Sequence, residues 1–433
     1  MGSACGKPNA VRPSSPDGRW AGTVRSSPTS LEECYTLHNK VGSGAFGTIY
    51  RATRTADGQC YAIKCGAGKA ALEANDSLVE EVDKWVELSA QRHPSILELL
   101  EVIQVVVGDG LQALPGVHLV TELLQGDLMS VLDQIAFSEQ ACRMVVLQIA
   151  SAIAHLHLRC SFAHCDIKPA NILCRDMHIE KPGCIKLCDF GFCQRFKSRR
   201  AAEFSIPCGT MEYFAPELVA TYEASRTRRR PSKVGSPTVG RGLRYGAAVD
   251  LCALGCCAYE LLVGEPPFLT ADDSKQLDAI REGELTFPEG GRNSEPGHRE
   301  SDASSTSTGE AVEASSFGKD QISPHSKGFI RMLLTRDPKL RMRIEDTLEH
   351  PWLQTIDDAR LRAKLERALP KSVGRRRETA ARIMNERDRA RLRLQDATFK
   401  IVQVRRLRGG RFSVDMHNFV SRRASATAAA LGS

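Results

Sequence analysis

The chain has 433 residues, of which 42% are hydrophobic and 26% charged, so it is long and apolar enough for a sizeable buried core. Its net charge of +7 comes largely from arginine-rich stretches at 226–230 and 360–411, which are typical of solvated surface, and we expect no nucleic-acid binding. The 15 cysteines come with no C-x-x-C pair, no cleavable signal segment and no apolar run of the ~18 residues that a membrane-spanning helix needs, which predicts free thiols rather than a secreted disulfide framework.

Residues 1–34 are predicted to be a disordered N-terminal segment, because 7–30 are rich in proline, serine and glycine. The opening MGSACGK is similar to an acceptor of myristate at Gly2 and palmitate at Cys5, and two acyl chains hold a protein stably on a membrane. Gly6 stands where that pattern has Ser or Thr, so a terminus without acylation stays an alternative. We expect a cytoplasmic location, with membrane association if the terminus is acylated.

From Tyr35 the pattern becomes strand-like, and VGSGAFGTIY places glycines on a G-x-G-x-x-G frame. Dinucleotide-binding folds share this frame, but in them a helix follows at once. Here another β-type run follows and ends in YAIK at Lys64. A glycine-rich hairpin lets the backbone approach phosphate groups closely, and the Lys64 amine would neutralise them.

The next elements alternate between helix and strand. Apolar spacing predicts a helix over 76–91, two strands near 100–107 and 117–123, and a long helix over 138–160. The last of these has an apolar repeat of 3.6 residues over most of its length, so it is expected to be buried.

A cluster of chemically active residues follows this helix. HCDIKPAN and the later DFG place Asp166, Lys168, Asn171 and Asp189 in one short loop and the next strand-turn. Phosphoryl transfer needs a carboxylate that accepts a hydroxyl proton, a cation near the transferred group and oxygen ligands for Mg²⁺. Each of these residues is common, but their joint spacing is not.

On these motifs the chain resembles a eukaryotic protein kinase over roughly residues 35–355. Lys168-Pro169 and the ending DPKLRMRIEDTLEHPWL resemble serine/threonine kinases of the calcium/calmodulin-dependent group. The resemblance implies a two-lobed α+β fold, with a β-rich N-lobe at 35–124 and a mainly helical C-lobe at 125–355. It also implies protein substrates and the cofactors ATP and Mg²⁺. The implied nucleotide site consists of Val41, Gly42, Gly44, Gly47, Ile49, Ala62, Lys64, Glu81, Thr121, Glu122, Leu124, Asp127 and Leu173.

The resemblance also implies a role for each residue of the catalytic loop. Asp166 would orient the substrate hydroxyl and accept its proton, Lys168 would stabilise charge on the γ-phosphoryl group, and Thr210 would bridge the two. Asn171 and Asp189 would hold Mg²⁺. The alternative is a pseudokinase that serves as a binding scaffold, and the presence of the whole set argues against it.

The resemblance gives three of these nucleotide-site residues a specific role. Glu81 fits best as the partner of Lys64, although Glu80 beside it is compatible with the same role. Thr121 would be a small gatekeeper residue in front of a back pocket. Asp127 would bind the ribose or a basic substrate residue, or else cap the next helix, since Asp is a favoured N-cap.

Cys165 departs from the family, which has arginine before the catalytic aspartate. That arginine commonly binds a phosphorylated activation-loop residue, and cysteine offers neither its charge nor its bidentate fork. We therefore predict that activity does not need activation-loop phosphorylation. Only Ser198 and Ser205 could accept phosphate between residues 191 and 209.

Other residues are expected to be structural. Glu217 should pair with Arg341, and Asp250 should hold the backbone of the catalytic loop. Cys188 and Cys193 flank DFG and are expected to fill space as small residues, because reactivity requires a lowered thiol pKa.

Three stretches carry no kinase motif. The insertions at 224–244 and 289–320 are poor in large apolar residues and are predicted to be disordered surface loops. The tail at 356–433 is basic and predicted to be partly helical. A basic helix there would bind calmodulin or occupy the active site as an autoinhibitor, and a solvated extension stays the alternative.

Overall fold

The computed structural model describes residues 24–26, 31–44, 47–65, 75–105, 116–132, 138–179, 181, 183–228, 243–288 and 322–354. The chain divides into two units, Met1–Gly374 and Arg375–Ser433, and all described residues belong to the first. The predicted acylation site, the second insertion and the basic tail lie outside the described residues.

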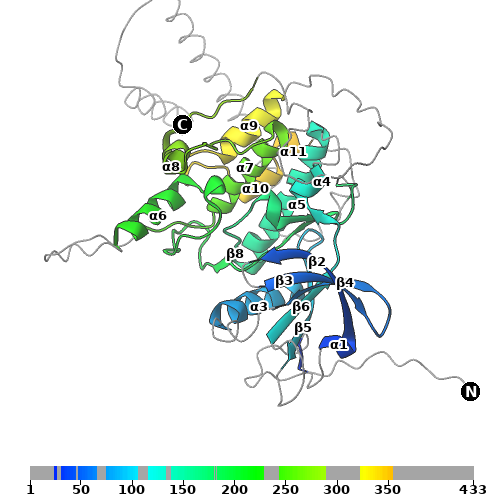
Figure 1. Ribbon diagram of the computed structural model, residues 1–433. Helices are drawn as coiled ribbons and strands as arrows, with labels where there is room; N and C mark the ends of the chain where they lie inside the picture. The colour runs from blue at the N-terminus through cyan, green and yellow to red at the C-terminus, as the bar shows by residue number, and fades with distance from the viewer. Residues whose placement is uncertain are drawn as a thin grey trace, which may run out of the picture. The chain divides into compact units, whose positions relative to one another are not determined.

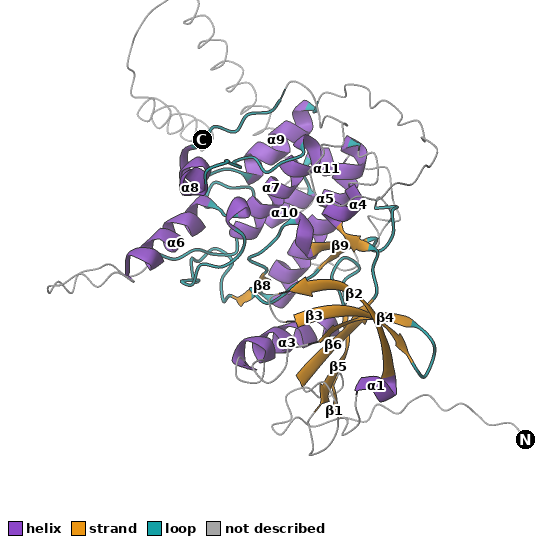
Figure 2. Cartoon of the chain, in the orientation of Figure 1, coloured by secondary structure: helices purple, strands orange, loops and turns teal. Residues whose placement is uncertain are grey.

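A six-stranded sheet forms the N-lobe, with the strand order β1-β5-β6-β4-β3-β2. Its strands fan out beside α3 (Figures 1 and 2). β1 runs parallel to β5, and the other neighbouring pairs are antiparallel. The elements of this lobe are β1 (Val24–Ser26), α1 (Leu31–Cys34), β2 (Tyr35–Gly44), β3 (Gly47–Arg54), β4 (Cys60–Cys65), α3 (Asn75–Ala90), β5 (Leu99–Val105) and β6 (Gly116–Glu122).

The two faces of this sheet pack into different clusters, because successive side chains of a strand point to opposite sides. Val102 and Leu119 pack into the main hydrophobic cluster together with Val82 of α3. The residues that follow them, Ile103 and Val120, pack into a smaller cluster on the other side. Both faces of the central strands are therefore buried.

The N-terminal boundary of the fold differs from the prediction. The prediction that residues 1–34 are disordered is wrong for β1 and α1, which form a strand and a helix. Leu31 is buried in the smaller cluster beside Tyr35, and the Thr55 N–H donates to the Cys34 carbonyl at 2.9 Å. Composition did not reveal β1 because its parallel pairing with β5 depends on backbone groups, which every residue carries.

The C-lobe is mainly helical, and the predicted two-lobed α+β arrangement is confirmed. Its core is built on α5 and α7, which are buried along nearly their whole lengths. The elements are β7 (Gly126–Asp127), α4 (Leu128–Leu132), α5 (Glu139–His155), the π-helical turn η1 (Leu156–Cys160), β8 (Phe162–Ala163), the 3₁₀ turn η2 (Pro169–Asn171), β9 (Ile172–Cys174), β10 (Ile185–Leu187), β11 (Gln194–Arg195), the 3₁₀ turn η3 (Met211–Tyr213), α6 (Pro216–Arg228), α7 (Val249–Val263), α8 (Asp273–Glu282), α9 (Pro324–Leu333), α10 (Ile344–Leu348) and α11 (Pro351–Gln354).

The helical segment Glu139–Cys160 starts at an N-cap, where the Ser138 hydroxyl accepts from the Ala141 N–H at 3.1 Å. By length and composition alone this segment could cross a membrane, which corrects the expectation that the chain has no such run. Because 83% of its apolar window is buried inside the domain, it fits the core helix of a globular protein.

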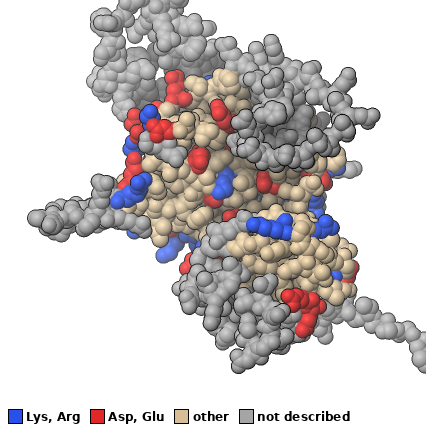
Figure 3. Space-filling model, in the orientation of Figure 1, with Lys and Arg blue, Asp and Glu red and all other residues tan. Residues whose placement is uncertain are grey.

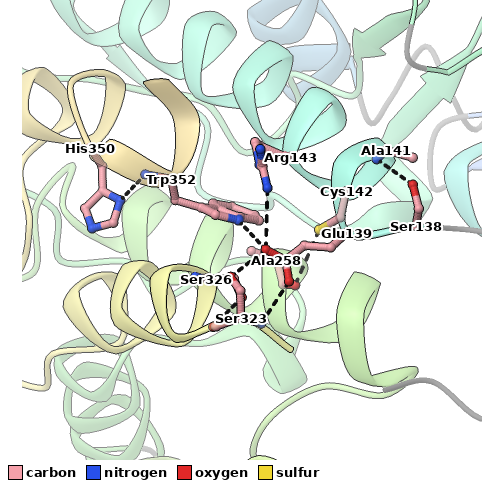
Figure 4. A network of polar contacts seen from close by, with 10 residues as sticks. All are labelled: Ser138, Glu139, Ala141, Cys142, Arg143, Ala258, Ser323, Ser326, His350 and Trp352. Atoms are coloured by element: carbon pink, nitrogen blue, oxygen red, sulfur yellow. Dashed lines mark hydrogen bonds and ion pairs between the residues drawn. The ribbon is translucent and has the colours of Figure 1, made fainter. Parts of the chain in front are cut away.

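A polar network ties the first turn of α5 to α9 and α11 (Figure 4). The carboxylate of Glu139 accepts from the Ser323 hydroxyl at 2.7 Å and from the Trp352 indole N–H at 2.8 Å, while Arg143 lies 3.6 Å away. Burial opposes the charge on Glu139, but these hydrogen bonds outweigh it and lower its pKa. The last described helix is thus fixed to the centre of the lobe.

The predicted first insertion, 224–244, overlaps the described residues at both of its ends. α6 continues to Arg228, so the first residues of the 224–244 stretch are helical, and residues 229–242 lie outside the described part.

On the face drawn in Figure 3, acidic and basic side chains of the described residues are interspersed.

Candidate active site

The catalytic loop is held from below by a buried carboxylate at the start of α7. Asp250 accepts from the backbone N–H groups of His164 and Cys165, both at 2.8 Å, and its Oδ2 lies 2.8 Å from His157 Nε2. Burial raises the pKa of Asp250, but the hydrogen bonds and the charges of the histidines outweigh it and lower the pKa. The loop therefore rests on a charged and fully buried anchor.

Above this anchor three predicted catalytic side chains form a closed triangle. Lys168 Nζ lies 2.5 Å from Thr210 Oγ1 and 3.1 Å from Asp166 Oδ2, and the Thr210 hydroxyl donates to Asp166 Oδ1 at 2.7 Å. The Asn171 amide donates to Asp166 Oδ2 at 2.8 Å. Both carboxylate oxygens of Asp166 are thus oriented by neighbours.

The DFG segment packs between α3 and the catalytic loop. The Phe190 ring is fully buried, with its centroid 5.6 Å from that of Trp85 and 5.5 Å from that of His164. His164 Nε2 lies 3.0 Å from the Cys188 carbonyl. Asp189 has a left-handed backbone, with φ of 64°, a conformation that non-glycine residues adopt mostly at functional sites.

The structure pairs Lys64 with Glu81 rather than Glu80. Lys64 Nζ lies 3.0 Å from Glu81 Oε1, and Glu81 is fully buried. Burial raises the pKa of Glu81, and the charge of Asp189 adds to the rise while Lys64 opposes it. Glu80 is 70% exposed and lies 3.8 Å from Lys84 on the outer side of α3. One residue along a helix turns the side chain by about 100°, which separates the two glutamates.

The remaining nucleotide-site predictions lie on the β2–β3 hairpin, the β4–β6 pair, the hinge and β9. Gly42 pairs with Ile49, Gly44 with Gly47, and Ala62 with Thr121, while Val41 is half-exposed and Leu124 and Leu173 pack on the main cluster. Glu122 is engaged by Lys186 at 3.0 Å and Arg175 at 2.5 Å.

Asp127 has the contact of a helix cap. Its Oδ1 accepts from the Ser130 N–H at 2.9 Å, in the first turn of α4. The geometry supports the capping alternative, and a role in binding ribose or a basic substrate residue stays a prediction.

The predicted packing roles of the two DFG-flanking cysteines fit their surroundings, since burial raises the thiol pKa of both Cys188 and Cys193. Sequence reasoning missed Cys208, two residues before Thr210. Its sulfur lies 3.2 Å from Gln194 Nε2 and 3.3 Å from Tyr245 Oη. The only signal for it was its place in the CGT motif beside the catalytic threonine.

Residues 35–353 match the protein kinase domain family, which is three quarters of the chain. The chain belongs to the protein kinase family.

Its relatives are serine/threonine kinases. A protein of Caenorhabditis briggsae called calcium/calmodulin-dependent protein kinase type 1 is 29% identical over 330 residues, 75% of this chain and 74% of that protein. The serine/threonine-protein kinase srk1 of Schizosaccharomyces pombe is 30% identical over 359 residues, 74% of this chain and 52% of that protein. Mouse serine/threonine-protein kinase 33 is 28% identical over 340 residues, 76% of this chain and 57% of that protein. The predicted ATP-dependent serine/threonine kinase of the calcium/calmodulin-dependent type is confirmed.

The donor set beside the triangle fits a magnesium ion. Carboxylate and amide oxygens are ligands that Mg²⁺ accepts, and Asp189 and Asn171 offer one each. The amide nitrogen of Asn171 is turned to Asp166, so its oxygen is the atom suited to a metal. Among the described residues no three His, Cys, Asp or Glu side chains gather into a metal-binding group.

Proposed function

We propose that this kinase transfers the γ-phosphate of ATP to Ser or Thr hydroxyls of protein substrates, using Asp166, Lys168 and Thr210 as its catalytic residues. The triangle of these side chains carries the proposal, because it holds a carboxylate, an ammonium group and the bridging hydroxyl in contact with one another. Asp250 fixes that geometry from beneath the loop.

Asp166 positions the substrate hydroxyl and takes its proton. Asn171 and Thr210 both donate to its carboxylate, which leaves the side chain little freedom to rotate. Lys168 stabilises the negative charge that spreads over the transferred group, and preorganised charges of this kind supply much of the acceleration. Asn171 and Asp189 would hold Mg²⁺, which would supply positive charge to offset that of the phosphates.

The nucleotide would lie under the β2–β3 hairpin. Lys64 would contact its α- and β-phosphates, and Glu81 keeps that amine in place. Glu81 is fully buried, so water does not compete with Lys64 for its carboxylate.

We further propose that the activation segment is held in place without phosphate. The Glu203 carboxylate accepts from the backbone N–H groups of Lys197 and Ser198 at 3.0 and 2.8 Å. Arg199 lies 2.6 Å from Glu345 on α10. These contacts bind the segment to itself and to the C-lobe, which supports activity without loop phosphorylation.

A further ion pair joins the segment to the N-lobe. Arg195 of β11 binds Glu87 of α3, so the helix that carries Glu81 is tied to the activation segment. This contact favours the position of α3 in which Lys64 and Glu81 meet.

Two further proposals rest on the sequence alone. The 356–433 tail would bind calmodulin or act as an autoinhibitor, and acylation at Gly2 and Cys5 would attach a cytoplasmic enzyme to membranes. Truncation at residue 356 should raise basal activity if the tail inhibits, and Gly2→Ala should abolish membrane attachment.

The test is transfer from labelled ATP and Mg²⁺ to a mixed Ser/Thr peptide set. Phosphatase-treated wild type and the double variant Ser198→Ala, Ser205→Ala should both transfer phosphate, whereas Asp166→Asn should not. Transfer only after phosphorylation of the loop would refute the loop-independent proposal. ATP binding without transfer by either wild type or the 356 truncation would instead favour the pseudokinase scaffold.

A further inference from the structure

Two thiols meet between the catalytic loop and the activation segment. Cys165 directly precedes Asp166, and Cys208 lies two residues before Thr210. The two thiols are close enough that each shifts the pKa of the other, that of Cys165 upward and that of Cys208 downward. A Cβ placed on Gly209 would lie only 2.5 Å from the Cys165 carbonyl oxygen, so the two backbones are in contact there.

The surroundings of the two thiols differ. Cys208 is partly exposed, its sulfur accepts a hydrogen bond from Gln194 Nε2 at 3.2 Å, and the Tyr245 hydroxyl oxygen lies 3.3 Å from it. The neighbouring Cys165 thiol lowers the pKa of Cys208 to about 7, and Tyr245 and Gln194 add to the fall while burial opposes it. Thiolate is the reactive form, so Cys208 is the nucleophile of the pair.

Cys165 has the opposite character. It is buried, and its backbone N–H is held by Asp250. The neighbouring Cys208 thiol, burial and the charge of Asp250 all raise its thiol pKa. Such a thiol reacts slowly with external reagents, but it is placed to attack an activated sulfur on Cys208.

We propose that hydrogen peroxide links Cys165 and Cys208 by a disulfide that reversibly stops phosphoryl transfer. The Cys208 thiolate attacks one peroxide oxygen, the O–O bond breaks, and one water leaves after protonation, which gives a sulfenic acid. The Cys165 sulfur then displaces the sulfenic oxygen, its proton leaves with that oxygen, and a second water forms. Two thiols and one peroxide thus become one disulfide and two waters, and a dithiol reductant reverses the link by exchange.

The disulfide disrupts the triangle of Asp166, Lys168 and Thr210 because residues 208–210 cannot approach Cys165 more closely without changing their conformation. A disulfide requires the two Cβ atoms to lie about 3.8 Å apart. The Gly209 backbone already touches the Cys165 carbonyl, so drawing Cys208 inward must shift residues 208–210. Thr210 then leaves Asp166 and Lys168, which it contacts at 2.7 and 2.5 Å.

The loss of activity rests on the proposed function, whereas formation of the bond does not. The full chain is treated with hydrogen peroxide, digested without reduction and analysed by mass spectrometry, and kinase activity is measured before treatment, after it and after a dithiol. We expect a peptide that joins Cys165 to Cys208, a fall in activity of about 100-fold, as a displacement near 1 Å can cause, and recovery on reduction.

Variants separate this pair from other thiols. Cys208→Ser should lose the peroxide sensitivity, each variant being compared with its own reduced state. Cys60→Ser is the matched control, because Cys60 is exposed and a hydrogen bond from Arg51 lowers its thiol pKa. It should stay as sensitive as wild type.

Two results would overturn the inference. One is an oxidised wild type without the linked peptide, and the other is a Cys208→Ser variant that peroxide inactivates like wild type. If the reduced wild type transfers no phosphate, the proposed function fails, and the linked peptide still decides whether the disulfide forms.

Discussion

Replacing Arg341 with methionine should destabilise the C-lobe strongly. The Arg341 side chain is fully buried and donates to both carboxylate oxygens of Glu217, at 2.7 and 2.8 Å. It also donates to the carbonyl oxygens of Thr335, Ala248 and Arg336. Methionine fills similar space but leaves a nearly buried carboxylate and three carbonyl groups without this donor.

The magnitude follows from the orphaned charge. Removing one partner of a buried ion pair costs about 3–5 kcal/mol. For a domain of this size 1 kcal/mol corresponds to roughly 2 °C in Tm, so we expect a fall of about 6–10 °C. The Tm of Arg341→Lys should lie between those of the wild type and Arg341→Met, because one ammonium group cannot reproduce the planar fork of the guanidinium group.

The measurement is thermal unfolding followed by circular dichroism at one scan rate. Arg343→Met is the matched control, since Arg343 is 51% exposed and pairs with Asp346 at 2.9 Å on the surface. An exposed pair of this kind contributes about 0–1 kcal/mol. The reasoning is refuted if Arg341→Met lowers Tm no more than Arg343→Met does.

Three further outcomes are expected. Glu81→Ala should lower phosphate transfer by about 100-fold because Lys64 loses its position, whereas Glu80→Ala should stay within about twofold, and equal losses would contradict the assignment. Thr210→Val should lower kcat by about tenfold or more while Thr210→Ser retains activity, since serine keeps the bridging hydroxyl. Burial lowers the pKa of His350 to about 4, so the unfolded chain binds more protons between pH 4 and 6.5 and stability falls as pH falls. In His350→Asn the side-chain amide oxygen still accepts from the backbone N–H of Trp352, as His350 does in the wild type (Figure 4). Between pH 7.5 and 5 the wild type should therefore lose about 2 kcal/mol more of its free energy of unfolding than the variant does. Parallel curves of Tm against pH for the two proteins would contradict this.

Much of the site could be predicted from the sequence, because the groups that phosphoryl transfer requires lie within short stretches of this chain. Asp166, Lys168 and Asn171 lie within six residues, and Asp189 follows after the two short strands β9 and β10. A loop that short can place these side chains together in few ways, so their spacing already implies the chemistry. The apolar repeat over 138–160 predicted a buried helix for the same reason, since the period of a helix is a local property.

Contacts between distant segments were decided only by the tertiary structure. Glu80 and Glu81 are neighbours with the same chemistry, and only the packing of α3 shows which of them faces Lys64. The strand β1 pairs through backbone groups that leave no trace in composition. Cys165 and Cys208 are 43 positions apart, and only the folded chain brings the Gly209 backbone against the Cys165 carbonyl. Sequence spacing predicts a site whose residues lie in one loop, whereas contacts between residues of different loops depend on how the chain folds.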